Sequence, residues 1–252
     1  MNDTIQNTLS KVPAVTFGFW IVKILATTLG ETGGDALSMS MNLGYLVSTA
    51  IFAVLFVAAV SVQLSMRRFH PVVYWLTIIA TTTVGTTLAD FADRSLGIGY
   101  AGGSTILLAL LLASLFVWHR TLGSIAIDTV SSRKAEIFYW VTIMFSQTLG
   151  TALGDWTADS AGMGYTGAAI LFGALLLLIA VLYYATRISR TLLFWAAFIL
   201  TRPLGAVVGD FLDKPLDHGG LNLSRYAASV SLFVLIALCI WILPQRPAQR
   251  AH

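Results

Sequence analysis

A repeat that can be read four times without gaps constrains this chain more than any other feature. Each copy begins at a tryptophan, carries a glycine ten residues later and an aspartate five residues after that. A second glycine lies twenty-four residues after the tryptophan. The four sets are Trp20, Gly30, Asp35 and Gly44; Trp75, Gly85, Asp90 and Gly99; Trp140, Gly150, Asp155 and Gly164; and Trp195, Gly205, Asp210 and Gly219. A register kept four times predicts four copies of one structural unit.

Charged residues are too scarce to cover a soluble surface. They make up 11% of the 252 residues, against 57% hydrophobic residues, and a soluble domain usually carries about 25% charged residues. This excludes an ordinary cytosolic enzyme and a disordered chain, and the single cysteine, Cys239, excludes a disulfide scaffold. The net charge of +3 is too small to indicate a nucleic-acid partner. The sequence therefore predicts an all-α integral membrane protein whose surroundings are the lipid bilayer.

Eight mostly apolar runs are long enough to cross a bilayer, which needs roughly 20 residues per helix. They span residues 13–35, 43–65, 71–91, 98–118, 136–156, 163–185, 191–212 and 223–243. Taken in pairs they give one membrane domain of four repeats, at 13–68, 71–120, 136–189 and 191–244. The tryptophan spacings of 55, 65 and 55 residues indicate two halves of two repeats each.

Two spans per repeat bring every copy into the membrane from the same side, so we expect parallel repeats. Their quasi-symmetry axis would lie along the membrane normal. The four first helices are expected around that axis, with the more apolar second helices facing lipid.

The basic residues predict the orientation, because cytoplasmic loops are enriched in Lys and Arg. With eight spans, ten of them fall on one side, and the opposite loops hold only Arg94, Lys214 and Arg225. Both termini should then be cytoplasmic. On this side the four repeat tryptophans are expected as interfacial anchors. The ten residues are Lys11, Arg67, Arg68, Arg120, Arg133, Lys134, Arg187, Arg190, Arg246 and Arg250.

A polar stripe follows each first helix in steps of four residues, a spacing that keeps side chains on one helix face. The stripes are Lys23, Thr27, Glu31 and Asp35; Ile78, Thr82, Thr86 and Asp90; Ile143, Gln147, Thr151 and Asp155; and Phe198, Arg202, Ala206 and Asp210. Such groups are costly against lipid, so they should face a protein interior or an aqueous cavity.

The stripes predict a site for a hard cation such as Mg, Mn or Ca, because carboxylate, hydroxyl and amide oxygens are the ligands these ions prefer. We interpret the five stripe acids as metal ligands, and five neighbouring polar residues as lining the ion-binding or translocation path. The acids are Glu31, Asp35, Asp90, Asp155 and Asp210, and the polar residues are Thr27, Thr82, Thr86, Gln147 and Thr151. No residue is assigned a catalytic role.

Two basic residues, Lys23 and Arg202, lie inside the predicted helices and are candidates for coupling ion movement to a second process. Guanidinium stays charged whereas a buried lysine can lose its proton, so Lys23 with Glu31 and Asp35 is the preferred group.

A packing role is the simpler reading of the glycines, and hydrogen bonding at helix ends is the simpler reading of the aspartates. Small residues four apart let membrane helices approach closely. The predicted helix-packing residues are Gly30, Gly34, Gly85, Gly150, Gly154, Gly205 and Gly209.

The fourfold Trp, Gly-x4-Asp and Gly-Tyr pattern resembles a bacterial family of multi-span inner-membrane proteins. That family is catalogued as uncharacterised membrane-anchored proteins built of tandem two-helix Gly/Asp repeats. The resemblance covers about residues 13–244 and implies the fold and a bacterial inner-membrane location, but no activity. Copy four departs from the pattern at Arg202-Pro203 and at Gly220, where the other copies have tyrosine, which argues against strict equivalence of the copies.

The leading functional hypothesis is a small membrane transporter of cations, divalent ones first, with proton coupling as an option. An alternative is a Mg-dependent intramembrane transferase acting on a lipid diphosphate, based on Asp155-x3-Asp159 and Asp210-x2-Asp213-x3-Asp217. A third is a non-transporting scaffold subunit. A homo-oligomer is compatible with all three.

Overall fold

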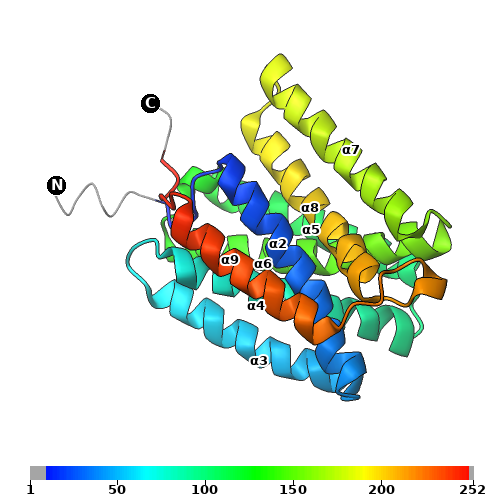
Figure 1. Cartoon of the computed structure of the whole chain (residues 1–252). Coiled ribbons are helices and arrows are strands. Elements are labelled where there is room, and N and C mark those ends of the chain that lie inside the picture. The colour runs from blue at the N-terminus through cyan, green and yellow to red at the C-terminus, as the bar shows by residue number, and fades with distance from the viewer. Residues whose placement is uncertain (1–9, 250–252) are drawn as a thin grey trace.

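The computed structural model describes residues 10–249, and over these residues it consists of helices joined by short turns (Figure 1). Eight of the helices are long, and they lie within a few residues of the eight predicted runs, so the all-α prediction is confirmed. They are α2 (Phe17–Asp35), α3 (Gly44–Ser65), α4 (Pro71–Asp90), α5 (Tyr100–Leu122), α6 (Arg133–Asp155), α7 (Gly164–Ala185), α8 (Arg190–Asp213) and α9 (Arg225–Ile242).

Local capping sets where the inner helices begin. α2 starts at Phe17 rather than at residue 13, because the Thr16 hydroxyl accepts a hydrogen bond from the Phe19 amide at 3.2 Å. Ser132 caps α6 in the same way, accepting from the amide of Ala135 at 3.2 Å. A side-chain oxygen at this position satisfies one of the free amides that every helix start leaves.

The first helices of the four repeats, α2, α4, α6 and α8, form a closed ring. α2 contacts α4, α4 contacts α6, α6 contacts α8, and α8 contacts α2. Each second helix packs on the first helix of the following repeat: α3 on α4, α5 on α6, α7 on α8, and α9 on α2. Figure 1 shows α9 alongside α2 and α7 alongside α8. The repeats therefore interlock, and the last one closes onto the first.

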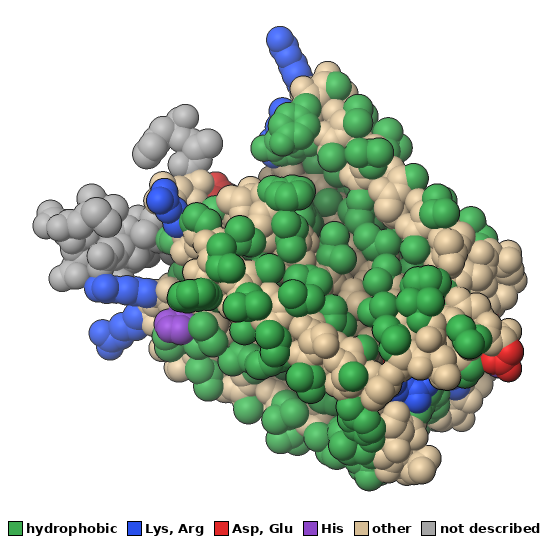
Figure 2. All heavy atoms as spheres, in the orientation of Figure 1, with side chains coloured by type: hydrophobic (Ala, Val, Ile, Leu, Met, Phe, Trp, Pro, Cys, Tyr) green, Lys and Arg blue, Asp and Glu red, His purple; other side chains and the backbone are tan. Residues whose placement is uncertain are grey.

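Within residues 10–249, six helical segments are long and apolar enough to cross a membrane: Gly44–Ser65, Pro71–Ser95, Tyr100–Leu122, Gly164–Ala185, Arg190–Asp213 and Arg225–Ile242. The outer helices α3, α5, α7 and α9 expose many Leu, Val and Ile side chains. Figure 2 shows hydrophobic side chains spread over one face of the molecule, with several Lys and Arg side chains projecting near the two ends of the described chain. An apolar surface of this extent is that of a membrane protein.

The other two long helices, α2 and α6, carry more polar residues, and most of their residues are buried within the ring.

A cluster of aromatic side chains fills the ring at the N-terminal ends of the inner helices. Trp75, Trp140 and Trp195 are at most 2% exposed, and the hydroxyls of Tyr74 and Tyr139 lie 2.6 Å apart. The expectation that the repeat tryptophans are interfacial anchors is therefore wrong for these three. The outer helices surround the first turns of the inner ones, so these rings pack against each other rather than against lipid.

Both ends of the described chain lie across this aromatic end of the ring (Figure 1). The amide of Ala248 donates to the carbonyl of Val12 at 2.8 Å, and the amide of Lys11 donates to the carbonyl of Val130 at 2.9 Å. The central loop and both chain ends thus cover one end of the ring together. Arg250, one of the residues used to predict orientation, lies outside the described residues.

Candidate functional site

The four polar stripes meet inside the ring. All sixteen stripe residues, from Lys23 to Asp210, are buried, and none is more than 3% exposed. Equivalent positions form successive layers along the ring axis, and the layer of repeat aspartates lies at the end opposite the aromatic cluster. The structure therefore places every predicted ion-path residue in the protein interior, away from lipid.

Glycines bring the inner helices close enough for these layers to form. A Cβ added at Gly30 would come within 3.0 Å of the Thr82 side chain, and one added at Gly34 would reach Thr86 at 3.0 Å. Both positions advance by four residues together, so α2 and α4 run in the same direction where they touch. Equivalent close approaches place Gly85 against Gln147 and Thr148, Gly150 and Gly154 against Arg202 and Ala206, and Gly205 and Gly209 against Thr27 and Glu31.

Arg202 of α8 occupies the centre of the ring. Its Nη2 atom donates to Glu31 Oε2 on α2 at 3.0 Å, to Thr86 Oγ1 on α4 at 2.5 Å and to Thr151 Oγ1 on α6 at 2.5 Å. Ala206 stands in α8 where the other copies have Glu31, Thr86 and Thr151. The departure of copy four from the repeat is thus the feature that ties the four inner helices together.

Lys23 lies one layer closer to the aromatic end and does not share the acids expected for it. Its Nζ is 3.4 Å from Gln147 Oε1 and 4.2 Å from the centroid of the Phe198 ring. Glu31 pairs instead with Arg202, and Asp35 pairs with Lys214. Within the described residues, Lys23 therefore forms no hydrogen bond or ion pair with Glu31 or Asp35, and its role in coupling stays a prediction.

Two basic side chains bridge the four repeat aspartates in pairs: Arg94 of the π-helical segment Phe91–Ser95, and Lys214 directly after α8. Arg94 contacts Asp90 at 3.2 Å and Asp155 at 3.0 Å. Lys214 contacts Asp35 at 2.5 Å and Asp210 at 3.1 Å. The aspartate layer is therefore covered by two cations rather than open to solvent.

Sequence reasoning missed the part played by Arg94 and Lys214, although a signal was present. Each stands four residues after the aspartate of its own repeat, at 90+4 and 210+4. Only repeats two and four carry a base there, and each base also reaches the aspartate of the next repeat around the ring. The equivalent residues in repeats one and three are Met39 and Asp159.

Lys214 follows the end of α8, and it is held in its charged form. Burial works against the charge on its ammonium, but the carboxylates of Asp210, Asp35 and Asp213 outweigh burial and raise its pKa well above the ordinary value. Lys214 therefore acts as a fixed positive charge over the aspartates.

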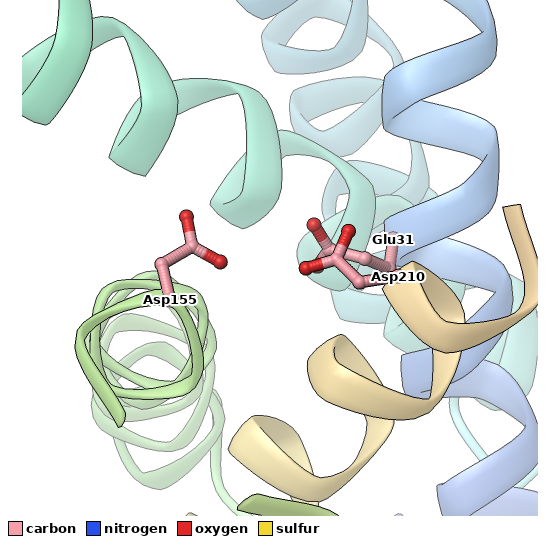
Figure 3. A group of neighbouring side chains, drawn as sticks. All are labelled: Glu31, Asp155 and Asp210. Carbon is pink, nitrogen blue, oxygen red and sulfur yellow. The ribbon is translucent and has the colours of Figure 1, made fainter. Parts of the chain in front are cut away.

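Three stripe acids from three inner helices converge inside the ring. One carboxylate oxygen each from Glu31, Asp155 and Asp210 lies within 4.8 Å of the others. In Figure 3, Asp155 on α6 points toward Glu31 and Asp210, which come from α2 and α8. Asp213, which lies outside the stripes, forms a second such group with Asp35 and Asp210. Oxygen ligands at this spacing suit a hard cation.

A cavity of about 490 Å³ lies over the aspartate layer, and we refer to it as the vestibule. Its lining includes Met39, Arg94, Asp159 and Lys214, the four residues that follow the repeat aspartates by four positions. Tyr100, Tyr165, Pro215 and His218 complete the lining. The vestibule is thus built from equivalent positions of all four repeats, and it leads to the two bases that cover the acids.

The tyrosine of the repeat helps to position Arg94 in this vestibule. Arg94 Nε donates to the hydroxyl of Tyr100 and Nη1 to that of Tyr45, both at 3.1 Å. The guanidinium is therefore held by two tyrosines and two aspartates.

Comparison with known families identifies the repeat. One family model, described as Repeat of Unknown Function (DUF347), matches the chain four times, at residues 18–69, 73–124, 138–189 and 193–246. The chain belongs to this family. No curated protein and no solved structure matches it.

Each DUF347 repeat corresponds to one inner helix and the outer helix that follows it. Each outer helix packs on the inner helix of the next repeat. The contacts of the candidate site therefore form between residues of different repeats. The pairing of Asp155 with Arg94, for example, joins the third DUF347 repeat to the second.

Proposed function

We propose that the chain crosses a bacterial inner membrane eight times, as four parallel repeats quasi-symmetric about the membrane normal, with both termini cytoplasmic. The closed ring supports this, because α2 and α6 can carry polar stripes across the bilayer only when neighbouring helices surround them. The meeting of both described chain ends at one end of the ring is expected for an even number of crossings.

We further propose that the protein is a small transporter of cations, divalent ones first, whose path follows the axis of the inner ring. The observation that carries this proposal is the convergence of Glu31, Asp155 and Asp210 within 4.8 Å, below a vestibule and between threonine-lined helices. Buried ionisable groups in a membrane domain commonly mark ion pathways.

The charge balance around the aspartate layer favours a cation. Five buried carboxyl groups lie there beside three basic side chains, so the carboxyl groups outnumber the bases by 5 − 3 = 2. The carboxylates are those of Asp35, Asp90, Asp155, Asp210 and Asp213, and the bases are Arg94, Lys214 and Arg225. A divalent ion would neutralise this excess, or would take the place of a base that moves toward the vestibule.

Arg202 closes the path below this layer and gives the proposed transporter a gate. Its guanidinium contacts three of the four inner helices at once. A cation that coordinates Glu31 would compete with Arg202 for the same carboxylate, so ion binding and release of the gate would be linked. In this proposal Arg202, rather than Lys23, couples cation binding to the opening of the path.

The experiment is a thermal-shift titration of the purified full-length protein with Mn²⁺, Mg²⁺ and Ca²⁺. A bound ion stabilises the folded state in proportion to ln(1 + [ion]/Kd), so at least one ion should raise the midpoint saturably. Asp155→Asn and Asp210→Asn should weaken this response. Asp217→Asn is the matched control, because its carboxylate is 79% exposed. No response from any ion would favour the scaffold hypothesis instead.

A further inference from the structure

Hydrogen-bond donors without acceptors gather inside the ring, between the aromatic cluster and the Arg202 gate. Arg202 Nε, Arg202 Nη1 and Gln147 Nε2 are buried and have no hydrogen-bond partner. Lys23 is 0% exposed, and its ammonium has only a 3.4 Å contact with Gln147 Oε1 and the face of Phe198. These donors come from α2, α6 and α8, so they surround one region of the axis.

Two basic side chains, Lys23 and Arg202, lie in this region with one acid, Glu31. Arg202 pairs with Glu31, which uses one positive and one negative charge. Lys23 has only an amide oxygen and an aromatic ring as partners, and its burial together with the nearby Arg202 disfavours the charged form of its amine. A buried charge without an opposite charge is strongly unfavourable, and buried donors without acceptors add to that cost. One small anion would remove both defects.

We propose that a small monovalent anion, a halide or a carboxylate of the size of formate, binds among Lys23, Gln147 and Arg202. It would accept hydrogen bonds from Lys23 Nζ, Gln147 Nε2 and the two free nitrogens of Arg202. The flexible stem of Lys23 lets the ammonium turn from the Phe198 ring toward the anion. This site lies deeper than the carboxylates and does not depend on cation transport, so either proposal can fail alone.

Sister repeats supply the variants that test this site. Lys23→Ile introduces the residue that repeats two and three carry at this position, Ile78 and Ile143. Gln147→Thr introduces the residue found at the equivalent position in repeats one and two. Arg120→Gln removes one exposed positive charge far from the axis and controls for general effects of protein charge.

The experiment measures the thermal midpoint of full-length protein in detergent during a bromide titration. Gluconate replaces bromide at constant ionic strength, and no divalent cation is present. Wild type and Arg120→Gln should show the same saturable rise. Lys23→Ile and Gln147→Thr should raise the half-saturating bromide concentration at least about tenfold, since each removes a hydrogen bond to a charged partner.

Anomalous scattering from bromide-soaked crystals gives a second measurement, which does not depend on how well the variants fold. A bromide peak within hydrogen-bond distance of Lys23 Nζ supports the proposal. The proposal is overturned if bromide gives wild-type protein the same thermal midpoint as gluconate and the crystals hold only water in this region. An unchanged half-saturating concentration in Lys23→Ile and Gln147→Thr overturns it as well.

Discussion

A methyl group added at Gly150 is the sharpest perturbation of the inner ring. Its Cβ would come within 3.0 Å of the Arg202 Cβ and Cγ atoms and would reach Pro203 Cδ at 3.0 Å. These carbons lie next to the α8 backbone, so they cannot give way unless the helix moves. Overpacking of this kind costs about 1–3 kcal/mol, and contact with atoms this close to the backbone places Gly150→Ala at the upper end.

Gly173→Ala in α7 is the matched control, because nothing lies within 4 Å of the added methyl. Both substitutions replace a helical glycine with alanine, so the gain in helix propensity of about 1 kcal/mol is common to both and cancels. The difference between them is then roughly 3 kcal/mol. At about 2–4 °C per kcal/mol for a chain of this size, this corresponds to about 6–12 °C in the unfolding midpoint.

The assay is thermal unfolding in detergent micelles, followed by tryptophan fluorescence. Buried Trp75, Trp140 and Trp195 report on the ring directly. Equal midpoints for Gly150→Ala and Gly173→Ala would show that α6 and α8 are not in contact at Gly150, and the packing of the ring would have to be revised.

Three further predictions concern charge and topology. Arg202→Met should lower the free energy of unfolding by about 3–5 kcal/mol, because it leaves the Glu31 carboxylate buried and without an opposite charge. In chemical unfolding, the double variant of Arg202→Met with Glu31→Gln should recover part of this loss. The pKa of Lys214 is raised, so its stabilising effect is lost only as the pH rises beyond the ordinary value of 10.5; Lys214→Met should therefore still lower the unfolding midpoint at about pH 9, and equal midpoints there would contradict the pairing of Lys214 with Asp35 and Asp210. In cells with the native cysteine replaced by serine, a membrane-impermeant thiol reagent added outside should label Leu216→Cys but not Lys134→Cys, and the reverse pattern would contradict the proposed orientation.

The sequence predicts the helices of this protein well, because their signals are local. Long apolar runs locate all eight helices to within a few residues. The four-residue spacing from Thr82 to Asp90 places polar groups on one face, which the structure buries. Within a helix, geometry is fixed by rise and turn alone, so a pattern read along the chain is sufficient.

Partners across the ring could not be predicted in this way. Lys23 is eight residues from Glu31 in sequence, but packing directs its side chain to Gln147 on another helix. Arg94 stands four residues after the aspartate of its own repeat, but its side chain also reaches Asp155 of the next repeat. Such pairs depend on the offset between neighbouring helices, which is set by glycine contacts and by the outer helices that pack between repeats.

The burial of the repeat tryptophans shows the same limit. A tryptophan at the start of a membrane helix is usually an interfacial anchor. Trp195 instead donates from Nε1 to the carbonyl of Ile125 at 3.0 Å, within the loop that covers this end of the ring. Its position in the sequence gives its depth along the helix but not which face of the helix is enclosed.

Cation flux into proteoliposomes tests the central claim most directly. Reconstituted wild-type protein should carry the divalent cation that stabilises it, and Asp155→Asn should abolish that flux. Asp159→Asn, which alters a carboxylate of the vestibule but not of the converging group, should retain it. Flux that is unchanged in Asp155→Asn, or absent from wild type for every cation that binds, would contradict a path through the aspartate layer.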